Sequence, residues 1–198
     1  MPKPLRPRTT FLIAILAGTA GTMGLAAWEN RPTARTAFVA APASPSAAFA
    51  SRHRVSERIW VAAQLETGDV AAARAEGFRA VIGLRPDGEE PAQPPANALA
   101  AYTGAEGLAF AHVPVPQGEL PDAVADALGA ALARVDGPVL LTCRSGRRAV
   151  RAWAVAEASR PGGASPEAIL AAAGAAGHSV DDLADRIKAR AARRASGG

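Results

Sequence analysis

The sequence predicts an α/β fold in which a central, mostly parallel sheet is flanked by helices. Short apolar stretches alternate with longer stretches of helical periodicity from about residue 53 to residue 190. Most of these stretches stop at glycine or proline, which is typical of short connections between elements. The only cysteine, Cys143, follows the last apolar stretch, at the end of a strand where such sheets bind ligands.

The elements follow one another in a regular order. Strands are expected at residues 59–62, 79–85, 108–115 and 137–143, since each is a short apolar run. Helices are expected between them and after the last of them, at residues 67–77, 95–107, 121–135, 147–160, 165–177 and 179–190. The helix at 121–135 has the clearest pattern, because Val124, Leu128, Leu132 and Val135 share one face.

The two ends of the chain differ from the middle. Residues 1–28 have a basic start followed by the apolar run 11–27, which predicts a signal peptide or an N-terminal membrane anchor. Residues 29–52 are rich in Ala, Pro and Ser and are expected to be a linker. Residues 53–190 would form the catalytic domain, and 191–198 a basic, disordered tail. We therefore expect export, with the domain periplasmic or tethered to a membrane outside the cytoplasm.

Composition excludes several classes of function. One cysteine in 198 residues allows no internal disulfide and no cysteine-rich metal site. The net charge of +4 comes from basic residues near both ends, without interleaved aromatics, so no nucleic-acid partner is expected. No histidine cluster has metal-ligand spacing. We expect no metal and no cofactor.

The stretch "CRSGRR" places the cysteine before a tight polar loop and a helix start. Backbone N–H groups at such a loop form an anion-binding nest, and the same positive field favours a reactive thiolate. Cys143 is the expected nucleophile and Arg148 the catalytic arginine; the substrate-binding residues would be Arg144, Ser145, Gly146 and Arg147. The competing interpretation is that a lone cysteine at a strand end is a buried, inert, small apolar residue.

This loop resembles the active loop of the rhodanese and cysteine-phosphatase superfamily. The stretches "RIWVAAQL", "GFRAVIGLRPDGEEPAQP", "GLAFAHVPV" and "EAILAAAGAAG" are similar, in this order, to the beta-lactamase-hydrolase-like, phosphatase-like domain family. The resemblance covers roughly residues 53–178. It implies a cysteine-phosphatase-like or rhodanese-like sheet flanked by helices. The family is catalogued both as phosphatase-like and as a sulfur transferase, so the resemblance leaves the transferred group open.

Loop length favours sulfur transfer. The phosphatases of this superfamily place five residues between cysteine and arginine, whereas four separate Cys143 from Arg148. The resemblance to rhodaneses predicts a sulfurtransferase that carries sulfane sulfur, from thiosulfate or a persulfide, on Cys143. The alternative is a phosphatase that acts on a phosphate ester through phosphocysteine, with Glu119 or Asp122 as general acid, because Gln117 stands where an acid is expected first. A third possibility is a non-catalytic anion-binding module.

Other residues are candidates for supporting the loop. Glu89 and Glu90 are expected to pair with the loop arginines, and Arg85 and Asp87 belong to the same segment, which lies near the active loop in the family. Thr142 occupies the position before the cysteine where phosphatases usually have histidine. Its hydroxyl is a candidate to bond the loop.

Overall fold

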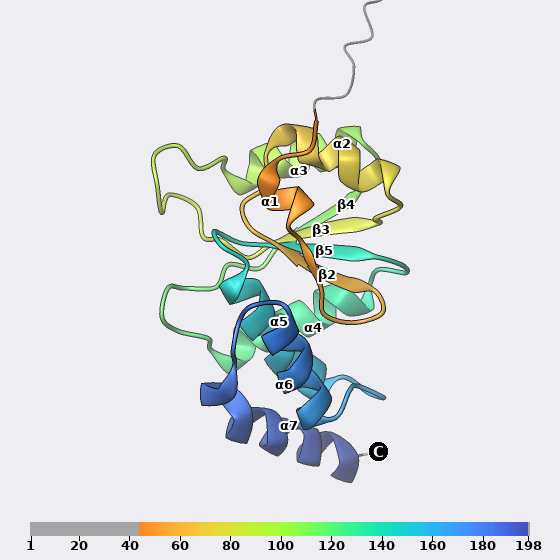
Figure 1. Ribbon diagram of the computed structural model, residues 1–198, viewed down its shortest axis with the longest axis vertical. Helices are drawn as coiled ribbons and strands as arrows, with labels where there is room; N and C mark the ends of the chain where they lie inside the picture. Colours follow the sequence, from red (N-terminus) through yellow and green to blue (C-terminus); the bar gives the residue numbers. More distant parts are fainter. Residues whose placement is uncertain (1–43, 198) are drawn as a thin grey trace, which may run out of the picture. The chain divides into compact units, whose positions relative to one another are not determined.

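The computed structural model describes residues 44–197, and the five strands of this region form one sheet in the order β1-β2-β5-β3-β4 (Figure 1). The strands are β1 (His53–Arg54), β2 (Ile59–Ala62), β3 (Ala80–Gly83), β4 (Ala109–His112) and β5 (Val139–Thr142). Only β1 runs antiparallel, to β2; the other neighbouring pairs are parallel. The mostly parallel sheet predicted from the sequence is confirmed.

Strand β5 lies in the middle of the sheet, between β2 and β3, and all four of its residues are buried. Side chains alternate between the two faces of a strand. Leu140 accordingly belongs to one apolar cluster, whereas Val139, Leu141 and Cys143 belong to the other. The strand that leads to the cysteine is therefore held on both faces and on both edges, which fixes the place of the loop that follows it.

Helices cover both faces of the sheet (Figure 1). One face carries α1 (Ala47–Ala50), α2 (Thr67–Ala75) and α3 (Ala96–Ala105). The other carries α4 (Asp122–Ala133), α5 (Arg147–Ser159), α6 (Pro166–Ala175) and α7 (Ala184–Ser196), the last preceded by a 3-10 turn η1 (Asp181–Leu183). Helix α5 is the central helix of this second layer: its side chains are buried from Ala152 to Ala158, many of them alanines that allow close packing.

The folded region begins before residue 53, contrary to the linker expected at 29–52. Residues 47–50 form α1, and Phe49 is fully buried in the cluster under α2. Ser46 donates from its backbone N–H and its hydroxyl to the two carboxylate oxygens of Asp69, both at 2.7 Å, and Asp69 is itself fully buried. The sequence missed this segment because one buried aromatic in an Ala-Pro-Ser context carries no periodic pattern.

The expected tail at 191–198 is also corrected. Helix α7 continues to Ser196; Ile187 is fully buried in the apolar cluster and Ala191 is 8% exposed. Arg194 donates from its guanidinium to the Ala164 carbonyl, which holds the end of this helix to the connection before α6. The basic residues thus belong to an amphipathic helix whose apolar face packs on the domain.

The signal peptide or anchor predicted for residues 1–28 lies outside the described residues. Among residues 44–197, none of the helices has the length and apolar character needed to span a bilayer.

Candidate active site

The cysteine loop connects the end of β5 to the start of α5. Gly146 is the N-cap of α5 and has a φ of 87°, in the left-handed region that favours glycine. A Cβ at this position would also lie 3.1 Å from Nε2 of His178. The loop is anchored to the end of β2, because the N–H of Cys143 donates to the Ala62 carbonyl at 3.4 Å and the N–H of Gln64 donates to the Arg144 carbonyl at 3.3 Å.

The backbone of the loop leaves a set of donors available. Within residues 44–197, the N–H groups of residues 144–148 donate to none of the backbone or side-chain acceptors. The first N–H groups of a helix have no partner inside the helix, and a nearby anion satisfies them well. The local geometry therefore agrees with the anion-binding loop that the sequence predicts.

The thiol itself is buried. Cys143 is 1% exposed and packs with the apolar cluster of the α4–α7 face. This burial is what the inert-cysteine interpretation predicts, but the thiol also adjoins a charged group. The pKa of Arg148 is raised above its usual value, chiefly by its hydrogen bond to Glu89, and the proximity of Cys143 acts in the same direction. Cys143 thus lies between hydrocarbon and a guanidinium.

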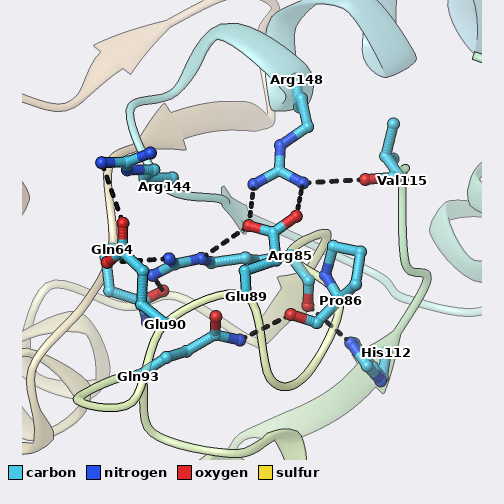
Figure 2. Close-up of polar contacts among 10 residues, drawn as sticks. All are labelled: Gln64, Arg85, Pro86, Glu89, Glu90, Gln93, His112, Val115, Arg144 and Arg148. Atoms are coloured by element: carbon cyan, nitrogen blue, oxygen red, sulfur yellow. Dashed lines mark hydrogen bonds and ion pairs between the residues drawn. The ribbon is translucent and has the colours of Figure 1, made fainter. Parts of the chain in front are cut away.

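Glu89 holds Arg148 end-on (Figure 2). Arg148 donates from Nη1 to Oε1 of Glu89 at 2.6 Å and from Nη2 to Oε2 at 2.7 Å, and Nη1 also donates to the Val115 carbonyl at 2.9 Å. Arginine has five N–H donors, so Nε–H and one Nη2–H remain on a single edge. Among the described residues, no oxygen accepts a hydrogen bond from this edge. Such an edge matches two oxygens of a tetrahedral oxyanion.

The same carboxylate is shared with a second arginine. Arg85, which follows β3, donates from Nε to Glu89 at 2.9 Å, and its side chain is 6% exposed. These hydrogen bonds, above all that from Arg148, lower the pKa of Glu89 from 4.5 to about 2 despite its burial. Glu89 therefore stays ionised at neutral pH and fixes both guanidinium groups.

Glu90 joins Arg85 to the cysteine loop. Its carboxylate pairs with Arg85 at 3.0 Å and with Arg144 at 2.8 Å, and Arg85 further donates to Gln64 at 3.3 Å (Figure 2). The pairing of Glu89 and Glu90 with loop arginines, predicted from the sequence, is confirmed. Arg144 is 60% exposed, so its pair with Glu90 is the outermost part of the network.

Two expected supporting residues act elsewhere. Asp87 accepts from the N–H of Ala96 at 2.8 Å, so it holds the start of α3 rather than the cysteine loop. Thr142 donates its hydroxyl to the Ala63 carbonyl at 2.6 Å, which ties β5 to the segment after β2. The hydroxyl proton is therefore used by Ala63, and among the described residues the Thr142 hydroxyl has no hydrogen bond to the cysteine loop. Ser145 and Arg147 are exposed on the loop and the first turn of α5.

The two candidate acids have different environments. Asp122 pairs with Arg186 and Arg190 of α7, and these arginines lower its pKa. A carboxylate held as an anion in this way is a poor proton donor. Glu119 is exposed on the connection between β4 and α4, and it makes no ion pair with another described residue. Of these two candidates, Glu119 is therefore the one whose carboxyl group is not held in an ion pair with a described residue and can deliver a proton.

Sequence reasoning gave no role at the site to Gln64, His112 or Gln93. His112 bonds the Arg85 carbonyl through Nε2 at 2.8 Å, and Gln93 donates to the Pro86 carbonyl at 2.7 Å (Figure 2). A signal did exist for two of them: His112 ends β4 and Gln64 comes two residues after β2, at the carboxyl edge of the sheet where polar side chains converge.

A nucleophile candidate at the end of a central parallel strand, with an open amide loop and an oriented arginine, defines a domain of the cysteine-phosphatase type. Residues 51–160 match the family model of the beta-lactamase hydrolase-like protein, phosphatase-like domain. The chain belongs to this family, and the resemblance found in the sequence is confirmed.

The curated relatives carry the same family name. The chain is 34% identical over 105 residues to the beta-lactamase hydrolase-like protein of Agrobacterium fabrum, covering 53% of this chain and 24% of the relative. It is 38% identical over 103 residues to the protein of the same name from Xylella fastidiosa, covering 52% of this chain and 24% of the relative. The chain thus matches only about a quarter of the length of these relatives.

Solved structures show the same fold. A candidate phosphatase from Neisseria meningitidis superposes with a TM-score of 0.61 at 24% identity, covering 71% of this chain and 98% of that one. A cysteine-to-serine variant of P. aeruginosa TpbA in complex with pTyr gives 0.53 at 18% identity, covering 74% and 91%. The phosphatase-like family fits the phosphatase alternative better than the sulfurtransferase that loop length favoured.

Proposed function

We propose that this domain hydrolyses phosphate monoesters through a phosphocysteine at Cys143. The observation that carries the proposal is the orientation of Arg148, whose end-on pair with Glu89 leaves one edge available beside the thiol. The open amides of residues 144–148 supply further donors for the phosphoryl oxygens. The family membership and the shared fold support phosphoryl rather than sulfur transfer.

In the first step, the Cys143 thiolate attacks phosphorus. The sulfur–phosphorus bond forms while the phosphorus–oxygen bond to the leaving group breaks. Arg148 and the loop amides stabilise the negative charge on the phosphoryl oxygens. These donors are already in position and need no reorganisation. Burial of the thiol strengthens these interactions, because the apolar cluster around Cys143 keeps the local dielectric low.

The leaving group and the water need a proton carrier. Glu119 in its acid form would protonate the departing alkoxide, and its carboxylate would then take a proton from the attacking water. Water breaks the sulfur–phosphorus bond, which releases inorganic phosphate and regenerates the thiolate. An aryl phosphate has a stable leaving group and depends less on this acid.

The test uses an aryl phosphate with the full chain. Wild type is expected to release phosphate, and acid-quenched protein should carry one phosphoryl group on Cys143. Cys143→Ser should lose at least a thousandfold in rate, because an unactivated hydroxyl is a poor nucleophile. Arg193→Gln, at an exposed position of α7, serves as the matched control and should keep full activity.

Two other results would overturn the proposal. If thiosulfate adds the mass of one sulfur atom to Cys143, while aryl phosphate is not hydrolysed, the loop transfers sulfur, as its four-residue spacing first indicated. If neither reaction occurs and inorganic phosphate still binds, the domain is a non-catalytic anion-binding module.

A further inference from the structure

A histidine outside the proposed chemistry touches the cysteine loop. His178 follows α6, where Gly177 has a φ of 76°. The N–H of Gly177 donates to the Gly174 carbonyl at 2.9 Å, and the N–H of His178 donates to the Ala173 carbonyl at 3.1 Å. This pair of bonds is the Schellman arrangement, which fixes the backbone just after a helix. His178 is thus held in a defined place by the end of α6.

From this place the imidazole reaches the start of α5. Nε2 of His178 would lie 3.1 Å from a Cβ on Gly146, so the ring packs directly on the loop backbone. The same Cβ would lie 3.8 Å from the backbone of Ala62, at the end of β2. In Figure 1 the connection after α6 (blue) rises beside the beginning of α5. The space beside Gly146 is therefore bordered by both His178 and the end of β2.

The contact between the His178 ring and the loop involves the polar backbone of Ser145. The backbone of Ser145 favours the protonated form of His178, as a carbonyl that accepts from the ring N–H does. Burial has the larger effect and lowers the pKa of His178, and the charges of His53 from β1 and Arg147 from α5 act in the same direction. The ring is therefore mainly a neutral hydrogen-bond donor at neutral pH.

We propose that His178 is a positioning residue for the cysteine loop, and that its ring holds the Ser145–Gly146 peptide so that the amides of residues 146–148 face the bound oxyanion. This contact gives the loop an imidazole support from the segment after α6. The position before the cysteine has instead Thr142, whose hydroxyl is bonded to Ala63. The inference rests on the proposed function only in requiring that the loop binds an oxyanion.

The experiment measures binding of tungstate, a tetrahedral oxyanion, by calorimetry alongside aryl phosphate hydrolysis. His178→Ala should weaken tungstate binding about tenfold, the value of one hydrogen bond in a preorganised site. His178→Gln should restore most of the affinity, because the glutamine Nε2 can donate to the same carbonyl. His53→Gln, which removes a nearby titratable ring from an exposed site, is the control and should bind as wild type does.

The outcomes separate this inference from the proposed function. If wild type binds tungstate without hydrolysing phosphate esters, and binding still depends on His178, the proposed function fails and the positioning role stands. If His178→Ala lowers the melting temperature but binds tungstate as wild type does, the histidine is merely structural and the inference fails. Equal losses in His178→Ala and His178→Gln, or no tungstate binding by wild type, would also overturn it.

Discussion

Replacing Glu89 by glutamine tests the charge network behind the cysteine loop. The side chain of Glu89 is 11% exposed and holds Arg85 and Arg148, whose side chains are 6% and 14% exposed. Glu89→Gln keeps the shape but leaves two largely buried guanidinium groups without their shared anion. Removal of one partner from such a pair is costly, because the remaining charge stays desolvated.

The magnitude follows from the pKa of Glu89, which the two arginines lower from 4.5 to about 2. At about 1.4 kcal/mol per pH unit, this shift corresponds to at most about 3 kcal/mol of folding free energy. Because the pKa is lower in the folded protein, the contribution is complete above about pH 4.5 and is lost as the pH falls to about 2. We expect Glu89→Gln to cost about 2 kcal/mol near neutral pH and less than half of that near pH 3.

The assay is urea unfolding of wild type and Glu89→Gln at both pH values. Glu106→Gln, an exposed carboxylate at the end of α3, is the control and should change the free energy of unfolding by less than about 0.5 kcal/mol. A cost for Glu89→Gln that is as small as the control, or that does not vary with pH, would refute the view that this carboxylate is the anionic centre of the network.

Two further predictions concern the ends of the fold and the general acid. Phe49→Ala should lower the free energy of unfolding by about 3 kcal/mol, because it empties a fully buried site; unchanged urea unfolding would mean that residues 47–50 are a linker after all. Glu119→Gln should slow hydrolysis of alkyl phosphates far more than that of aryl phosphates, whereas Asp122→Asn should leave both rates near wild type, since Arg186 and Arg190 already hold that carboxylate as an anion. The reverse pattern in steady-state kinetics would assign the acid to Asp122.

Local patterns were enough for most of the elements. The apolar run at 59–62 predicts a strand with the same bounds as β2. The capping Ser165 and the proline after it predict the start of α6. The ends were missed for a physical reason. Phe49 is buried in the cluster under α2, and the neighbouring Ser46 bonds Asp69, so the burial depends on contacts distant in sequence.

For the site, the sequence alone predicted the candidate residues and their position: one thiol, followed by a short glycine-containing loop and arginines, at the carboxyl end of a buried strand. The reason is that strand, loop and helix cap are local, so neighbouring residues suffice to specify them. The sequence did not decide which group is transferred, since loop length favoured sulfur and the family name favours phosphate. Only the tertiary structure decided which acid meets which arginine, that Asp122 pairs with α7, and that His178 reaches Gly146. These contacts join segments separated by tens of residues, and packing of the helices on the sheet, rather than any local pattern, brings them together.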